Sequence, residues 1–192
     1  MKNIENNKGF ILILTLVLVA AFSRLIPHAP NFTAVGAMAL FGAAHFTKKY
    51  LAFVVPIAAM WFSDLFINNF VYASESFVWF QSFQLYTIIP MALIVLAGLF
   101  LFKNKVTPSN VLGGSVLATI IFFLVSNFGT WISPYSLFPN TFGGLVSTYV
   151  AGLPFALNTL AGDMFFSLAL FGSFFLFTTK FPSFKLAKVK SK

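Results

Sequence analysis

The chain has 192 residues, of which 59% are hydrophobic and 8% charged, and it carries a net charge of +8. Soluble domains have about 25% charged residues, so the composition excludes a soluble globular domain and predicts an integral membrane protein. Because the lysines cluster at the ends of apolar segments, the positive charge indicates membrane topology and not nucleic-acid binding. The absence of cysteine excludes disulfides and thiolate chemistry, and no phosphate-binding Gly-Lys-Ser/Thr loop is present.

Six apolar segments are predicted to form transmembrane helices within a single domain, residues 1–192. A crossing needs about 20 mostly apolar residues, so the second segment is short for a span. The segments lie at residues 10–26, 32–46, 50–72, 83–102, 109–131 and 154–179. The first segment also resembles a signal peptide, but Val19-Ala20-Ala21 is a poor cleavage site. The expected fold is therefore an all-α membrane bundle.

The connections between segments include two candidate lids. Pro27 and Pro30 block a continuous helix between the first two segments, so residues 27–31 should form a turn. Residues 132–153 are uncharged and contain several prolines and glycines. We expect a long loop there, with a short interfacial helix at residues 141–151. Loops of this length are often lids or binding loops.

The charges predict how the segments cross the membrane. If all six cross, every lysine lies on one side, whereas Arg24, His28 and Glu75 lie on the other. If the second segment did not cross, Lys2 and Lys8 would lie opposite the other lysines. The positive-inside rule therefore favours six spans in a bacterial cytoplasmic membrane, with both termini in the cytoplasm.

Polar residues within the apolar segments fall in the half away from the lysines, and they are the candidate ligand-binding residues. A bare carboxylate such as Asp163 costs at least about 2.5–3.5 kcal/mol inside a membrane, so it needs a proton, a partner or a wet cavity. The candidates are Arg24, Asn31, Asp64, Asn68, Asn127, Trp131, Asn158 and Asp163. Together they predict a pocket that opens outward, with apolar walls and a few convergent polar groups.

A structural role for the same residues is the alternative. Asparagine and aspartate can join helices, at about 0.6 kcal/mol per hydrogen bond. Arg24 can form an ion pair with Asp64 or Asp163, and Trp131 is also typical of an aromatic belt at the membrane interface. No metal site or cofactor is predicted, because His28 has no second histidine on its side.

Four blocks of the sequence resemble a family of uncharacterised bacterial membrane proteins. They are the stretch from Arg24 to Gly42, Ser63-Asp64-Leu65, Ser126-Asn127-Phe128-Gly129-Thr130-Trp131, and Pro154-Phe155 with Asn158-Thr159 and Gly162-Asp163. More loosely, the layout is similar to the substrate-binding S components of energy-coupling factor (ECF) vitamin transporters. Those are six-helix proteins that work with a transmembrane coupling subunit and two ATPases.

This resemblance implies an S-component-like bundle, uptake of a micronutrient and a coupling partner. S components usually dock through an Ala-xxx-Ala face on their first helix. Here the first segment has only Ala20-Ala21, and the nearest equivalent is Ala39 and Ala43 in the second. That pair suits docking or packing within the bundle.

We expect a membrane subunit that binds a small vitamin-like molecule and is energised by a partner, and we do not expect an enzyme. Two other functions are possible from the sequence. A proton-coupled secondary transporter using Asp64 or Asp163 is the alternative, although no internal repeat of the kind common in such transporters is present. A membrane aspartyl hydrolase would pair the two carboxylates, but Leu160-Ala161-Gly162 precedes Asp163 where such proteases have Gly-x-Gly.

Overall fold

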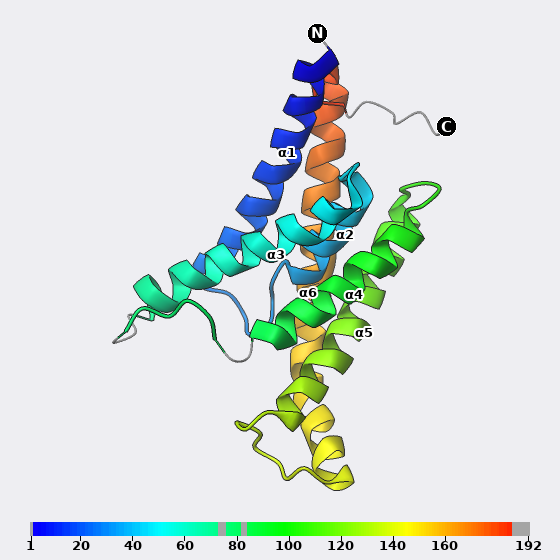
Figure 1. Ribbon diagram of the computed structural model, residues 1–192. Coiled ribbons are helices and arrows are strands. Elements are labelled where there is room, and N and C mark those ends of the chain that lie inside the picture. The colour runs from blue at the N-terminus through cyan, green and yellow to red at the C-terminus, as the bar shows by residue number, and fades with distance from the viewer. Residues whose placement is uncertain (1, 73–75, 82–83, 186–192) are drawn as a thin grey trace.

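The computed structural model describes residues 2–72, 76–81 and 84–185, with side chains from residue 8 onward. The described residues form α-helices and short helical turns, without a strand. The α-helices are α1 (Lys2–Phe22), α2 (Val35–His45), α3 (Lys49–Phe66), α4 (Leu85–Leu101), α5 (Pro108–Ile132) and α6 (Phe142–Lys180) (Figure 1). Short turns follow α1 (Ser23–Leu25), α3 (a π-helical turn, Ile67–Val71) and α6 (Pro182–Phe184). The predicted all-helical class is confirmed for this part of the chain.

Four helical stretches are long and apolar enough to cross a bilayer. They are Lys8–Leu25, Lys49–Val71, Pro108–Ile132 and Phe142–Lys180. The helices α2 and α4 are apolar but shorter. These lengths indicate a membrane protein. Glu75, Phe83 at the start of the predicted fourth segment, and the tail lysines Lys188, Lys190 and Lys192 lie outside the described residues.

The prediction of a long loop between the fifth and sixth segments is wrong. Helix α6 begins at Phe142 and continues without a break to Lys180, so the expected interfacial helix and sixth span form one helix of 39 residues. Pro154 lies inside this helix, as Pro56 does in α3 and Pro90 in α4. A proline removes one backbone hydrogen bond but does not end a helix when its neighbours hold the axis in place.

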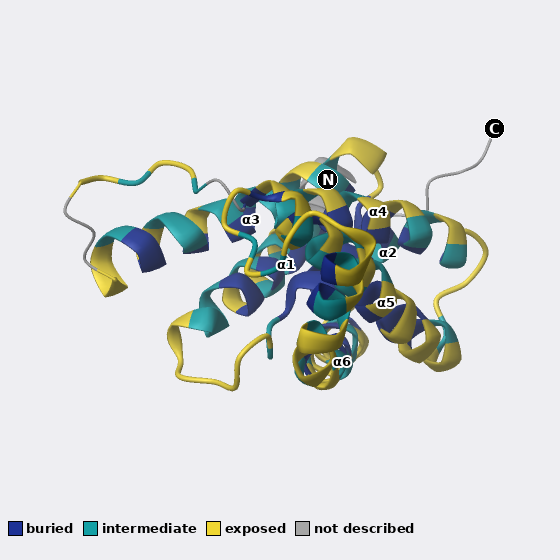
Figure 2. Cartoon of the chain, turned by 90° about the horizontal axis from the view of Figure 1, so that it is seen from below, coloured by how far each residue is buried: buried dark blue, intermediate teal, exposed yellow. Residues whose placement is uncertain are grey.

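Helix α2 occupies the centre of the bundle. Val35 to Ala43 are all buried, and α2 packs against α1, α3, α4, α5 and α6. Figure 2 shows the buried faces of the surrounding helices turned inward and their exposed faces turned outward. Small side chains permit this approach: a Cβ on Gly98 of α4 would lie 2.8 Å from the Cβ of Ala43. Ala39 and Ala43 are therefore internal packing residues.

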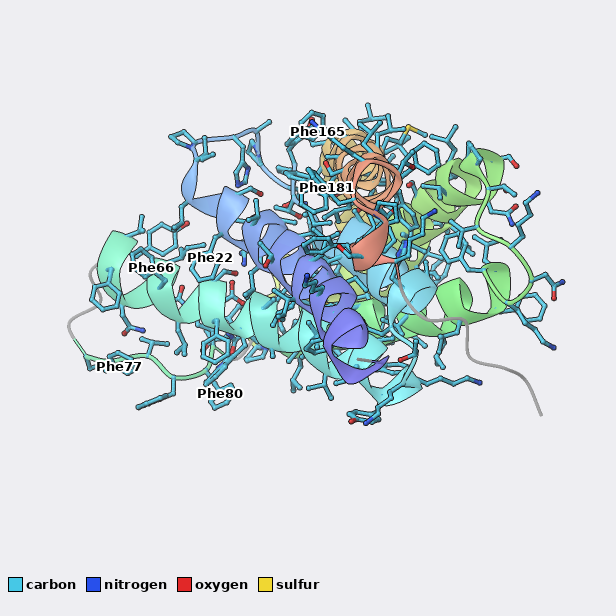
Figure 3. The ribbon with its side chains drawn as sticks, turned by 90° about the horizontal axis from the view of Figure 1, so that it is seen from above. Phe22, Phe66, Phe77, Phe80, Phe165 and Phe181 are labelled. Atoms are coloured by element: carbon cyan, nitrogen blue, oxygen red, sulfur yellow. The ribbon has the colours of Figure 1, made fainter. Side chains whose placement is uncertain are left out.

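The start of α1 and the end of α6 lie side by side at one end of the molecule (Figure 1). The Lys8 ammonium lies 6.0 Å from the centre of the Phe184 ring. The connection between α5 and α6 lies at the opposite end. Phe22 and Phe66 come together where α1 and α3 end, with ring centres 6.4 Å apart (Figure 3).

Candidate functional site

Asp163 lies in the core against the first turn of α2. Asp163 is 1% exposed, and its carboxylate faces the backbone N–H groups of Gly36 and Ala37. A Cβ on Gly36 would come within 2.5 Å of Oδ1. Oδ1 accepts no hydrogen bond of ordinary geometry from the described residues, so its contact with α2 is mainly electrostatic.

Helix α2 needs this carboxylate because it has no cap of its own. Its N-cap residue is Ala34, which makes no side-chain hydrogen bond. The first N–H groups of a helix are unpaired and carry a partial positive charge. The Asp163 carboxyl group faces these N–H groups from α6, which is distant along the chain, and the partial charges of α2 would stabilise its ionised form.

Hydroxyl groups of α5 complete the surroundings of Asp163. Thr119 donates a hydrogen bond of 2.9 Å to Oδ2. One turn earlier, Ser115 donates to Ser167 of α6 at 2.9 Å. Ser115 and Ser167 are completely buried. Asp163 therefore has partners within the bundle, and it lines neither of the two polar cavities described below.

Two of the sequence blocks, residues 24–42 and 154–163, contact each other. Asn158 donates a hydrogen bond of 2.9 Å to the carbonyl oxygen of Pro30. A Cβ on Gly162 would lie 2.8 Å from the backbone nitrogen of Thr33, so only glycine allows this close approach. Asn31 has a φ of 63°, which permits the turn that brings the chain back toward α2. These contacts hold the segment before α2 against α6.

Arg24 and Asp64 form an ion pair where α1 and α3 end. The Arg24 guanidinium also donates to the Ser63 hydroxyl at 3.1 Å, and Gln84 donates to the other carboxylate oxygen of Asp64 at 3.3 Å. The two charged side chains are 22% and 18% exposed. The structure thus pairs Arg24 with Asp64, while Asp163 has separate partners.

A cavity of about 340 Å³, which we call the ion-pair cavity, adjoins this pair. Four predicted site residues line it: Arg24, Asn31, Asp64 and Asn68. Asn68 lies in the π-helical turn after α3, a feature that is frequent at functional sites. The neighbouring Asn69 holds the following loop, since it donates to the Val78 carbonyl at 3.0 Å and accepts from the Val78 N–H at 2.7 Å.

A second cavity of about 310 Å³, which we call the amide cavity, lies between α4, α5 and α6. Asn31 lines this cavity as well, together with Asn127. Its walls combine amide, hydroxyl and aromatic groups and contain no charged residue. The lining residues are Asn31, Tyr86, Thr87, Phe122, Phe123, Ser126, Asn127, Thr130, Gly152, Phe155, Ala156 and Thr159.

The amide of Asn127 is held in place on one side. Its nitrogen donates to the Phe123 carbonyl at 2.8 Å, and a Cβ on Gly152 would lie 2.4 Å from its oxygen. Thr159 similarly donates to the Phe155 carbonyl at 3.0 Å. Their oxygen atoms keep acceptor capacity, so the wall can accept hydrogen bonds from a bound molecule.

Besides Asp163, two more predicted site residues lie outside both cavities. Trp131 donates to the Pro139 carbonyl at 3.2 Å and so holds the connection between α5 and α6. Asn158 holds the segment before α2, as described above. Gln84, Tyr86 and Thr119 also contribute to these sites, although no sequence pattern singled them out. A signal existed for Thr119, because Ser115 and Thr119 are four residues apart and share one helix face.

Comparison with known proteins finds one family. The model of a family of unknown function, DUF6580, matches residues 4–184. No curated protein and no solved structure matches the chain. A functional proposal therefore depends on the geometry described above.

Proposed function

The chain belongs to the DUF6580 family of unknown function, and we propose that it is a substrate-binding membrane subunit for the uptake of a small vitamin-like or micronutrient molecule. The amide cavity is the observation that carries this proposal. Binding sites for small molecules are concave, with mostly apolar walls and a few polar groups that fix orientation. The amide cavity, with a volume of about 310 Å³, has a size that suits a small ligand, and its wall is rich in hydrogen-bonding groups, since seven of its twelve lining residues carry a side-chain amide or hydroxyl.

The ligand class follows from the groups in the wall. No ionised side chain lines the amide cavity, and burying an unpaired ion there would be costly. The rings of Tyr86, Phe123 and Phe155 offer apolar or stacking surfaces. We propose an uncharged molecule with a flat or apolar part and several hydrogen-bonding groups.

The proposed topology has six crossings and both termini in the cytoplasm. The short helix α2 would complete its crossing together with the extended residues that precede it. Non-helical backbone is tolerated at membrane depth where protein buries it or where it lines a water-filled cavity. In the extended stretch before α2, Asn31 lines both polar cavities, residues 32–33 are half-buried and Ala34 is buried. The amide cavity would then open on the side opposite the lysines.

A partner is part of the proposal, because the sequence carries no nucleotide-binding loop. A transmembrane coupling subunit with ATPases would supply the energy. Ala39 and Ala43 pack inside the bundle, so such a partner would use a different surface of this chain.

The experiment is native mass spectrometry of the protein purified gently from its own membrane. We expect one small molecule bound to each chain. Thr159→Val removes a hydroxyl from the cavity wall with little change in shape, and Asn127→Ala removes the amide. Losing one hydrogen bond should weaken binding about three- to tenfold.

Thr148→Val is the matched control, since Thr148 is buried in the same helix, donates to the Gly144 carbonyl at 2.9 Å and lies outside the cavity. If the Thr159, Asn127 and Thr148 variants bind the small molecule equally well, the amide cavity is not its binding site. Co-purification of an ATPase pair would support the partner.

One observation favours a proton-coupled secondary transporter as the second candidate. Thr159, Asp163 and Ser167 follow one face of α6 at four-residue intervals. Thr159 lines the amide cavity, and Ser167 lines a groove toward the other end of the molecule. Asp163 lies between them. Uptake that depends on a pH gradient in vesicles containing this chain alone would favour this candidate over a binding subunit.

A further inference from the structure

Tyr86 is a residue of the amide-cavity wall whose hydroxyl group is available to a bound molecule. It lies in the first turn of α4, is half-buried and lines the cavity. Among the described residues, its hydroxyl group makes no hydrogen bond. Buried tyrosine hydroxyls usually have a hydrogen-bond partner, and a bound molecule can supply the partner that Tyr86 lacks within the described chain.

Gly129 of α5 fixes the position of the Tyr86 ring. A Cβ on Gly129 would lie 2.3 Å from Cδ1 and 2.6 Å from Cγ of Tyr86, so the ring lies directly against the α5 backbone. Gly129 is buried inside a helix of 25 residues, where glycine is less favourable than alanine. The close approach of Tyr86 gives the physical reason for glycine here. Any larger residue would displace the ring from its place in the cavity wall.

Gly152 of α6 gives Asn127 the same kind of support. A Cβ on Gly152 would lie 2.4 Å from Oδ1 of Asn127. Because the Asn127 nitrogen donates to the Phe123 carbonyl, Oδ1 and one N–H bond remain for a ligand. Tyr86 and Asn127 are thus each held against the backbone of a neighbouring helix. Such a preorganised wall loses little conformational freedom when a ligand binds.

The hydroxyl groups of the wall divide into acceptors and donors. Ser126, Thr130 and Thr159 each donate to the carbonyl four residues earlier in their helix, at 2.6, 3.0 and 3.0 Å, so their oxygens remain as acceptors. The O–H groups of Tyr86 and Thr87 have no partner among the described residues and remain as donors. A complementary ligand therefore needs both N–H or O–H donors and an acceptor.

We infer that Tyr86, positioned by Gly129, donates a hydrogen bond to the ligand, and that the ligand is an uncharged flat ring with an N–H donor and a carbonyl acceptor, as in a lactam. The aromatic side chains of the wall suit a flat ring, and an amide group supplies a donor and an acceptor without a charge. This inference rests on the proposed function, because it concerns the amide cavity. A role of Tyr86 in packing alone would need its ring but not its hydroxyl.

Three bicyclic probes of similar size separate the two kinds of hydrogen bond. Oxindole carries an N–H group and a carbonyl group, indole carries only the N–H group, and 1-methyloxindole carries only the carbonyl group. Their dissociation constants are measured by ligand-observed NMR with the full-length chain in lipid nanodiscs, and empty nanodiscs correct for partition into lipid. We expect oxindole to bind the wild-type chain about three- to tenfold more tightly than either other probe.

Tyr86→Phe removes the hydroxyl group and keeps the ring. This variant should bind oxindole and 1-methyloxindole about three- to tenfold more weakly than the wild-type chain, and it should bind indole within about twofold of the wild-type affinity. Tyr149→Phe is the matched control, because Tyr149 donates to the Leu124 carbonyl at 2.8 Å and lies outside the amide cavity. The control should bind all three probes as the wild-type chain does.

Gly129→Ala tests the positioning of the ring. The added methyl group displaces Tyr86, so binding of oxindole should weaken at least about fivefold. Gly113→Ala, in the same helix, is the matched control, since a Cβ there meets no atom within 4 Å and Gly113 lies outside the cavity. If Gly129→Ala does not fold, the Tyr86→Phe result decides the inference.

Three results would overturn the inference. The first is unchanged oxindole binding by the folded Tyr86→Phe variant. The second is a wild-type affinity for oxindole that does not exceed the affinity for indole. The third is equal binding by the Gly129→Ala and Gly113→Ala variants. If Thr159→Val and Asn127→Ala still weaken binding of the co-purified molecule, the proposed function stands and only the role of Tyr86 and the ligand class fail.

Discussion

Asp64 and Asp163 have the same side chain, and the structure stabilises them in different ways. The Asp64 side chain is 18% exposed and pairs with the full charge of Arg24 beside a cavity. Asp163 is 1% exposed and is stabilised by the start of α2 and by the hydroxyl of Thr119. Among the described residues, Asp163 therefore meets a helix N-terminus and a hydroxyl group, whereas Asp64 meets an opposite charge.

Asp64 is a partly exposed residue beside a cavity, whereas Asp163 is a buried residue that packs between helices. Asp64 lies where solvent can reach both partners, so its ion pair is screened and contributes little to stability. Asp163 joins three helices, because it touches α2 and α5 from α6. The following predictions test this difference, beginning with the largest effect.

Replacing Asp163 should have the largest effect. Asp163→Leu removes the carboxyl group that faces the first turn of α2 and leaves the Thr119 hydroxyl without its acceptor, and it should lower the free energy of unfolding by about 2–4 kcal/mol. Unfolding in detergent, followed by circular dichroism, measures this. Asp163→Asn keeps an acceptor oxygen and should stay within about 1 kcal/mol of wild type. Equal stability of the Leu and Asn variants would contradict the capping role.

An added methyl group at Gly36 should have the next largest effect. The new Cβ would lie 2.5 Å from Oδ1 and 2.7 Å from Oδ2 of Asp163, so the carboxylate must move away from α2. We expect Gly36→Ala to cost about 1–3 kcal/mol. Gly113→Ala is the control, where a Cβ meets nothing within 4 Å; this variant should be up to about 1 kcal/mol more stable. The capping geometry is wrong if both variants behave alike.

The ion pair should give the smallest effect. In a double-mutant cycle with Arg24→Gln and Asp64→Asn, we expect a coupling energy of about 0.2–1 kcal/mol, measured by the same unfolding assay. Because both side chains are partly exposed, the coupling should fall as salt increases. A coupling energy above about 2 kcal/mol that does not change with salt would show that the Asp64 ion pair is shielded from solvent, as Asp163 is.

The positions of most helices follow from apolar segments in the sequence. Segments 50–72 and 109–131 agree closely with α3 plus its π-helical turn and with α5. The connection after α5 was predicted poorly, because Pro154, Gly143 and Gly144 resemble loop residues. Helix α6 contains all three, since packing against α5 can outweigh local preferences against a helix.

The ligand pocket stays a prediction, and the structure divides its candidate residues among two cavities and the core. Arg24, Asn31, Asp64 and Asn68 do come together at one cavity, as their shared position away from the lysines indicated. Asn127 belongs to the other cavity, and Asp163 to the core. Spacing along a helix shows which residues share a face, but it does not show which neighbouring helix that face meets.

Composition and hydropathy alone determined the membrane class, the helical fold and the segments that carry polar groups, because each depends on local sequence. The tertiary structure decided which charge Arg24 meets, why Asp163 is tolerated and where the cavities lie. These depend on contacts between distant segments, such as Gly36 with Asp163 and Pro30 with Asn158. The carboxylate that caps α2 lies more than a hundred residues away along the chain, and only folding brings the two together.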